Sequence, residues 1–308
     1  MKKMVNDSSN RRITHLKVLW EKNQPHIQIY DHDTEKVTTQ SLIGYGLSYQ
    51  VPTPFEKVCV NYGDLFKAEK QNRCEKLVKS GKKCGNCIRE DNIFASQFHN
   101  VHTKDRSSIS QKILKSMEKE NILYIAGFLD GSTKVGTSAS SRIQTRLLEQ
   151  GAIHAVLVVE TPDGITVRLL EDLITKELGV GQAISTRRKI DGLLNPLMKD
   201  SLQEELNIIS KRVKECILTS GITEITEIDT TWDNEYSSEK CWEKIQKYPI
   251  NLSTGSHDME ILSVVGRVVA LNHSSGMTLL ADLDELLGIT VEYGQILGDE
   301  ISVQAKLF

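Results

Sequence analysis

The sequence has no long apolar run. No stretch approaches the roughly 18 consecutive apolar residues that a transmembrane helix requires, and the opening residues MKKMVNDSSN lack the apolar core of a signal peptide. We therefore expect a protein that does not span a membrane and that works in the cytoplasm.

An excess of positive charge is also absent. The chain carries 38 Lys and Arg against 41 Asp and Glu, for a net charge of −3. Proteins that bind nucleic acid often have a basic surface, because neutralising phosphates supplies much of their affinity. Any such surface in this chain must be local. The remaining composition, with 39% hydrophobic and 26% charged residues over 308 positions, is that of an ordinary soluble protein with a sizeable core.

Cysteine is scarce, with six in the chain, but four of them lie close together at Cys59, Cys74, Cys84 and Cys87. In a cytoplasmic protein such a group indicates a metal site or reduced thiols before it indicates disulfides. The last two form a C-x₂-C knuckle whose thiolates can converge on one tetrahedral ion, so we predict that the four bind a structural Zn²⁺. Two alternatives stay open: His99 or His102 replaces one thiolate, or the four are free thiols.

Residues 121–178 alternate signals of strands and helices. The expected strands are apolar or rich in β-formers and cover Ile122–Phe128, Lys134–Thr137 and Ala155–Val159. Asp130-Gly131 is a strong turn signal between the first two, which predicts a β-hairpin. The serines of 138–141 are candidate N-caps for a helix, and a second helix is expected at Thr166–Leu178 with Gly179 at its end. The order hairpin, helix, strand, helix predicts a small α/β sandwich.

Charged side chains on the two expected helices are candidates for chemistry. Glu171 lies at the flank of the apolar stripe of its helix, where a carboxylate is partly desolvated and needs a metal or a partner. A structural ion pair with a nearby arginine is the alternative. Arg142 and Arg146 are spaced i,i+4 and share a helix face, which suits capture of phosphate or carboxylate. They could equally form a solvated face beside Glu149.

The segment as a whole resembles the GIY-YIG nuclease domain. Leu123-Tyr124 stands where that family has its first motif and Lys134-Val135-Gly136 where it has its second, while Arg146 matches the helix arginine and Glu171 the metal-binding glutamate. More closely, the strings KVGTS, RLLEQGA and LLED resemble an uncharacterised prokaryotic family that joins a cysteine-rich segment to a GIY-YIG-like core. In that family Cys59 and Cys74 usually open further C-x₂-C pairs, whose second positions here are Tyr62 and Leu77.

The resemblance implies a separate catalytic role for each of these residues. Tyr124 would accept the proton of an attacking water, Arg146 would stabilise the charge on the phosphate, and Glu171 would hold one Mg²⁺ or Mn²⁺. Lys134 replaces the second-motif tyrosine and is expected to orient water or phosphate, or to lower the pKa of Tyr124. Arg142 and Gly136 are expected to border the substrate. No clear counterpart exists for the asparagine that usually follows the glutamate.

The fold class is therefore predicted as α+β, with a GIY-YIG-like core flanked by a cysteine-rich zinc segment and β-rich terminal segments. Charged and amphipathic helices are expected at Lys104–Glu120 and Leu202–Leu218. Both ends of the chain have the alternation of antiparallel strands, and we expect them to pack together. Four segments follow from composition: 1–58, 59–118, 119–195 and 196–308.

The first functional hypothesis is a metal-dependent phosphodiester hydrolase that acts on nucleic acid. The second is an enzyme that uses the same cleft on a small anionic metabolite, and the third is a non-catalytic, zinc-stabilised binding module. A positive stripe past Arg146 and the basic run Arg187–Lys189 would favour nucleic acid, whereas a closed pocket over Tyr124 would favour a small molecule. A fully ion-paired Glu171 would favour the binding module.

Overall fold

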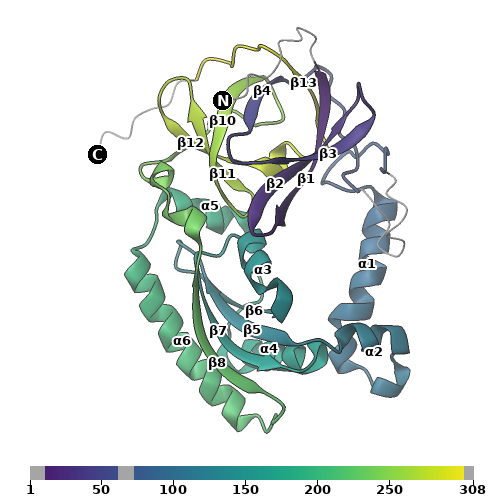
Figure 1. Cartoon of the computed structure of the whole chain (residues 1–308), viewed down its shortest axis with the longest axis vertical. Coiled ribbons are helices and arrows are strands. Elements are labelled where there is room, and N and C mark those ends of the chain that lie inside the picture. The colour runs from purple at the N-terminus through teal and green to yellow at the C-terminus, as the bar shows by residue number, and fades with distance from the viewer. Residues whose placement is uncertain (1–10, 62–72, 302–308) are drawn as a thin grey trace. The chain divides into compact units, whose positions relative to one another are not determined.

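A computed structural model of the chain describes residues 11–61 and 73–301 and separates into two compact units (Figure 1). The first combines Met1–Arg89 with Lys240–Phe308, and the second is Glu90–Glu239. These limits differ from the four segments drawn above, because composition marks local changes along the chain whereas the units reflect contacts between distant residues.

The first unit is built on a nine-stranded sheet with the strand order β3-β2-β1-β13-β4-β10-β11-β12-β9. Its strands are β1 (Arg11–Glu21), β2 (Gln24–Asp31), β3 (Lys36–Ser41), β4 (Gly46–Gln50), β9 (Gln246–Lys247), β10 (Ser256–Val265), β11 (Val268–His273), β12 (Thr278–Asp282) and β13 (Thr290–Tyr293). β1 pairs antiparallel with β13, with Ile13 opposite Val291. Strands from the two ends of the chain thus form one sheet, which confirms the expectation that the ends pack together.

The second unit contains an antiparallel four-stranded sheet with the order β6-β5-β7-β8. Its strands are β5 (Asn121–Gly127), β6 (Thr133–Ala139), β7 (His154–Thr161) and β8 (Thr226–Asp233). The predicted hairpin is confirmed: Gly131 has φ +80, and Asp130 accepts from the Ser132 N–H at 3.1 Å to close the turn. β8 was not predicted, because most of its side chains are exposed and polar and show no apolar alternation.

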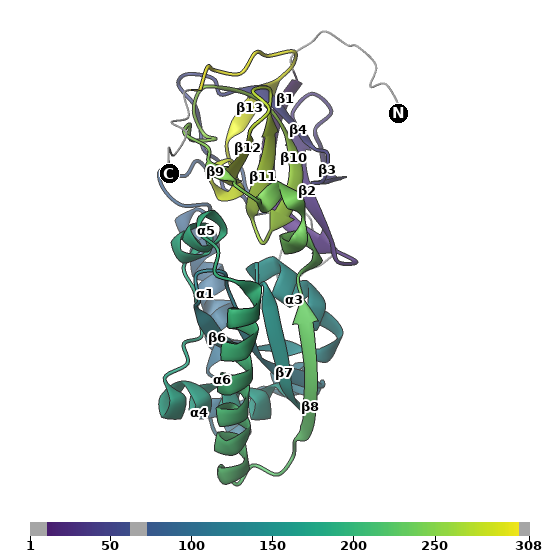
Figure 2. The ribbon, with the colours of Figure 1, turned by 90° about the vertical axis from the view of Figure 1, so that its left-hand side faces the viewer.

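Helices cover both faces of this sheet (Figure 2). α3 (Ile143–Gln150) packs on the face of Tyr124, where Ile143 and Leu147 join a buried cluster with Tyr124, Ala126 and Phe128. α4 (Gly164–Leu178) and α6 (Lys199–Thr219) lie on the opposite face. A Cβ at Gly127 would meet the Leu202 and Leu206 side chains of α6 at 2.9 and 3.1 Å, so glycine allows that helix to approach closely. α4 runs from an Asp163 cap to a left-handed Gly179, close to the predicted limits.

The other helices are α1 (Gly85–His99), α2 (Gln111–Met117) and α5 (Thr186–Leu194), with 3-10 turns at Val101–Thr103, Arg106–Ser108, Ser140–Arg142, Glu235–Ser238, Lys240–Trp242 and Leu283–Glu285. None of the helices in the described ranges is long and apolar enough to cross a membrane. The predicted amphipathic helix at Leu202–Leu218 is confirmed by α6.

Two helix predictions are wrong. The charged helix expected at Lys104–Glu120 is reduced to α2, because Asp105 holds a turn ahead of it and Ser110 caps the helix through the Ile113 N–H. Ser138 and Ser140 do not cap α3: the first lies in β6 and the second hydrogen-bonds Glu160 at 2.6 Å. α3 therefore begins at Ile143 without a side-chain cap.

Candidate functional site

Four cysteines of the first unit come together from three segments of the chain. Backbone hydrogen bonds hold the first two side by side: the Cys59 N–H donates to the Lys76 carbonyl, and the Cys74 N–H donates to the Asn61 carbonyl, each at 2.9 Å. The segment around Cys59 and the segment around Cys74 therefore form a short ladder. This pairing brings two thiols together that are 15 positions apart in the sequence.

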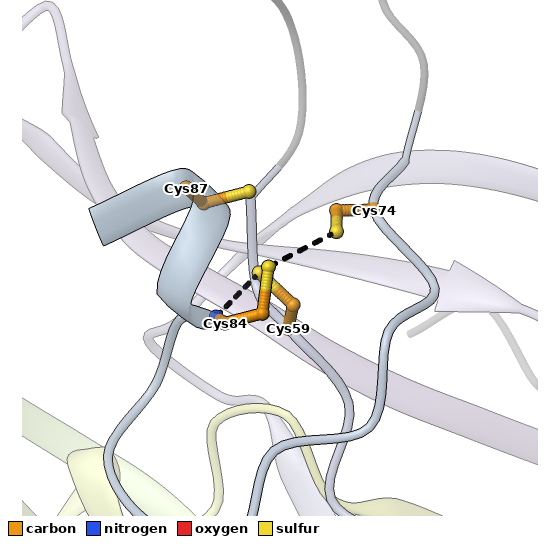
Figure 3. Close-up of side chains that lie close together, drawn as sticks. All are labelled: Cys59, Cys74, Cys84 and Cys87. Atoms are coloured by element: carbon orange, nitrogen blue, oxygen red, sulfur yellow. Dashed lines mark hydrogen bonds between the residues drawn. The ribbon is translucent and has the colours of Figure 1, made fainter. Parts of the chain in front are cut away.

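The knuckle at the start of α1 supplies the other two thiols (Figure 3). The Cys84 N–H donates to the Cys59 sulfur at 3.3 Å, and the sulfurs of Cys74 and Cys84 are 3.8 Å apart. All four sulfurs lie within 4.8 Å of one another, and none is in a disulfide. Cys59, Cys84 and Cys87 are buried.

This arrangement suits a tetrahedral ion. Four sulfurs at the usual 2.3 Å from zinc would be separated by about 3.8 Å. The observed separation of Cys74 and Cys84 has that value, at 3.8 Å. The Cys87 N–H hydrogen bond lowers the pKa of Cys84 to about 7, while burial raises the pKa of Cys74 and of Cys87. The four cysteines thus form a group that could hold a metal.

The two histidines considered as zinc ligands, His99 and His102, have different outcomes. His102 belongs to the second unit, where its Nε2 lies 2.7 Å from Asp172, and the possible ligand group in the described ranges contains only cysteines. The idea that His102 replaces a thiolate is therefore wrong. The side chain of His99 lies outside the described residues, as does Tyr62, and Leu77 is exposed.

A second group of predicted residues surrounds Tyr124 in the second unit. Its ring is fully buried and lies against Gly136, its partner on the neighbouring strand: a Cβ at Gly136 would be only 2.5 Å from the phenolic oxygen. The hydroxyl donates to Gln150 Oε1 at 3.0 Å. Burial raises the pKa of Tyr124, and the nearby charge of Arg146 lowers it by less.

Lys134 lies on the same face of β6 as Gly136, two residues earlier, and is only 8% exposed. Burial, together with the positive charges of Arg146 and Lys189, lowers the pKa of Lys134 to about 8, against the opposing effect of Glu171. Arg146 is itself exposed. Phenol, ammonium and guanidinium thus meet on the α3 face of the sheet.

Glu171 comes from α4, on the opposite face. Its carboxylate accepts from Thr137 at 3.5 Å, and Thr137 points away from the face of Gly136 and Tyr124. Because β6 is the edge strand, the carboxylate still lies near enough for its charge to raise the pKa values of both Lys134 and Tyr124. Burial raises the pKa of Glu171 itself. The carboxylate of Glu171 therefore lies on the α4 side of β6 and acts on Lys134 and Tyr124 through its charge.

Arg142 is set apart from this group. It is exposed and forms an ion pair with Glu149 at 3.1 Å, the solvated arrangement considered above. Its predicted place beside the substrate stays a prediction.

Sequence reasoning missed two residues near Tyr124. Gln150 accepts the phenolic hydrogen bond, and its own carbonyl accepts from Lys189 Nζ at 2.7 Å. Lys189 also lies over the Phe128 ring. The i,i+4 spacing of Arg146 and Gln150 on one helix face could have indicated that Gln150 lies near Tyr124. No local feature of the sequence indicates that Lys189, and not its neighbours, lies near Tyr124. Arg188 instead forms an ion pair with Asp130 at 2.7 Å, and Arg187 is exposed.

Fold and site together define a mixed α+β protein with two open sheets and a four-cysteine cluster. The family model described as "Protein of unknown function (DUF2797)" matches residues 46–273, and the chain belongs to this family. That match does not tie the chain to the GIY-YIG nucleases. No curated protein matches the chain, and no solved structure does.

Proposed function

We propose that the second unit is a metal-dependent phosphodiester hydrolase of GIY-YIG type that acts on nucleic acid. One observation supports this most: four chemically different groups from distant parts of the sequence lie near the edge strand β6, where the charges of Arg146 and Glu171 shift the pKa values of Tyr124 and Lys134. They are the phenol of Tyr124, the ammonium of Lys134, the guanidinium of Arg146 and the carboxylate of Glu171.

These groups suit hydrolysis of a phosphodiester. Arg146 and Lys134 provide positive charge for the non-bridging oxygens, which gain negative charge in the transition state. Glu171 is half-buried and accepts a hydrogen bond from Thr137, and the charge of Arg168 lowers its pKa against the effect of burial. A partly buried carboxylate of this kind is a suitable ligand for Mg²⁺ or Mn²⁺. Such an ion would polarise the phosphoryl oxygens when bound.

A small anionic substrate is the second candidate. Tyr124 is 0% exposed and Lys134 only 8%, so a phosphate must come close to buried groups to touch them. A small phosphate ester reaches such groups more easily than a duplex, and the net charge of −3 gives no general attraction to nucleic acid. The same residues serve either substrate.

The test is hydrolysis of defined substrates with Mg²⁺ or Mn²⁺. End-labelled single- and double-stranded DNA and RNA test the first candidate, and bis(4-nitrophenyl) phosphate tests the second. Glu171→Gln and Arg146→Ala are each expected to lower turnover about 100-fold, the usual loss for one charge-stabilising group. Glu177→Gln, on the same helix and exposed, is the matched control and should keep full activity.

The outcomes separate the candidates. Cleavage of the labelled strands supports a nuclease, and hydrolysis of the small ester alone supports the second candidate. If the wild type hydrolyses neither, or if Glu171→Gln matches Glu177→Gln, the proposed function is wrong.

The four cysteines are proposed as ligands of one structural Zn²⁺. Support comes from the mutual distances of their sulfurs, all within 4.8 Å, and from the all-thiolate donor set that structural zinc sites use. The ion would stabilise the Cys59–Cys74 ladder and the start of α1, which have few apolar contacts of their own.

A further inference from the structure

The helix α6 has an exposed face that packs against no other element of its unit. Its opposite face is buried, through Leu202, Leu206, Ser210, Val213 and Ile217. On the exposed face, Ile208 lies near the middle of the 21-residue helix and is 62% exposed. A single exposed isoleucine is ordinary on a protein surface, but the side chains on either side of this one follow a pattern.

The charges on this face change sign at Ile208. Glu204 and Glu205 lie one turn before it, and Lys211 and Arg212 lie one turn after it, so all four point to the same side of the helix as the isoleucine. All four are exposed, and in the described part of the chain none of them forms an ion pair. The face therefore has an acidic half, an apolar centre and a basic half.

A second copy of the chain fits this pattern when the two helices pack antiparallel. A two-fold axis at Ile208 places the two isoleucines against each other and the acidic half of each helix against the basic half of the other. Glu204 then faces the partner's Lys211, and Glu205 faces the partner's Arg212. A parallel arrangement would instead place like charges together, which costs free energy.

A hollow beside the end of α6 matches the start of the partner's helix. It has a volume of about 550 Å³, and its lining includes Leu173 and Leu178 from α4 and Cys216 and Thr219 from α6. In the antiparallel arrangement the partner's Met198, which precedes its α6 and is 76% exposed, falls at the level of this hollow. A methionine that packs there gains apolar contacts that it lacks in a single chain.

We propose that α6 is a dimer interface that joins two copies of this chain across a two-fold axis at Ile208. This interface does not depend on the proposed hydrolase function. Its apolar side chains supply the affinity and its charges set the antiparallel direction, because exposed ion pairs contribute little free energy whereas like charges placed together are costly. One helix per copy makes an interface at the small end of the usual range, so we expect a dissociation constant of about 1–10 μM.

Sedimentation velocity of the full chain at concentrations up to roughly 100 μM measures the association. The wild type should approach twice the mass of one chain as the concentration rises. Glu204→Lys/Glu205→Lys makes the whole face basic and should weaken the dimer about 100-fold, as should Lys211→Glu/Arg212→Glu, which makes it acidic. All four substitutions in one chain exchange the two signs and should restore the wild-type association. An equimolar mixture of the two double variants should also associate, since their faces are then opposite in charge.

Two controls fix the place and the register of the interface. Glu118→Lys/Glu120→Lys makes the same change of charge at exposed positions outside α6 and should dimerise like the wild type. Ile208→Cys, at the axis, should give a disulfide-linked dimer on mild oxidation. Leu218→Cys, at a position that is 68% exposed, should not, because its two copies would lie about 30 Å apart.

The proposal is overturned by any of three results. A wild type that stays monomeric at the highest concentration has no such interface. A dimer that Glu204→Lys/Glu205→Lys weakens no more than the Glu118→Lys/Glu120→Lys control uses another surface. If Leu218→Cys cross-links as readily as Ile208→Cys, or if neither the fourfold variant nor the mixture of double variants associates while circular dichroism shows them folded, the antiparallel pairing is wrong.

Discussion

At the scale of single residues, the missing side chain of Gly136 matters most for the second site. The Tyr124 ring occupies the volume that a Cβ would fill, with the phenolic oxygen and Cζ both 2.5 Å from that position. The pair faces each other across β5 and β6. Glycine is therefore required here by close approach and not by an unusual backbone angle.

Gly136→Ala is expected to destabilise the protein by about 1–3 kcal/mol, because the methyl group must push the buried ring aside. Urea denaturation followed by circular dichroism measures the change. Gly181→Ala is the control, since nothing lies within 4 Å of its Cβ position and its φ is not in the left-handed region. Equal stability of the two variants would show that the ring moves freely and that the contact is unimportant.

At the scale of elements, the cysteine segment depends on a few backbone hydrogen bonds and on its thiols. The ladder of Cys59 and Cys74 contacts the start of α1 at the four sulfurs and at the Cys84 N–H, and the Val60 N–H donates to the Lys82 carbonyl just before that helix. The buried cluster here consists of the three buried cysteines, with Cys74 and Val78 at its border. So small an apolar cluster supplies little folding free energy by itself.

Cys84→Ser is expected to release the zinc ion and to expose this segment to proteases, because a hydroxyl is a poor ligand for zinc and the folding of the segment is coupled to the metal. Metal analysis should find about one zinc per wild-type chain. Limited proteolysis should find new cleavage near the cysteines in the variant. Cys216→Ser, on α6 and outside the cluster, should retain the metal. Wild-type protein purified without any zinc would contradict the proposal.

At the scale of the whole molecule, the two units differ in how they use the chain. The second unit is continuous, from Glu90 to Glu239, and contains its own sheet and helices. The first needs both ends, since β1 pairs with β13 and β4 pairs with β10. Strands β1–β4 alone would lack the strands with which β1 and β4 pair.

The fragment 90–239 is therefore expected to fold on its own, and the fragment 1–89 is not, because its sheet lacks strands β9–β13. Dispersed amide signals in NMR and a cooperative thermal transition measure folding of each fragment. Mixing 1–89 with 240–308 is the control, since together they restore the complete sheet. Cooperative folding of 1–89 alone would show that the terminal strands are not needed.

Local signals in the sequence were enough to predict many of the turns and helix ends of the second unit. Asp130 and Gly131 predicted the hairpin, and Gly179 predicted the end of α4, since turns and helix ends depend on a few adjacent residues. The spacing of Cys84 and Cys87 predicted a knuckle for the same reason. Where local features competed, prediction was wrong: Ser110 caps a short α2, and the serines of 138–141 lie in β6 and in a 3-10 turn.

Contacts between distant residues were decided only by the tertiary structure. β8 joins the sheet through backbone hydrogen bonds to β7. Its polar side chains give no indication of this pairing in the sequence. Lys189 turns toward Gln150 while its neighbour Arg188 pairs with Asp130, although the sequence shows both as one basic run. The sequence by itself determined which chemical groups are present and how each short segment folds, because those depend on neighbouring residues. Only the packing of helices on both faces of an edge strand decided that the charge of Glu171 acts on Lys134 from the opposite side of the sheet.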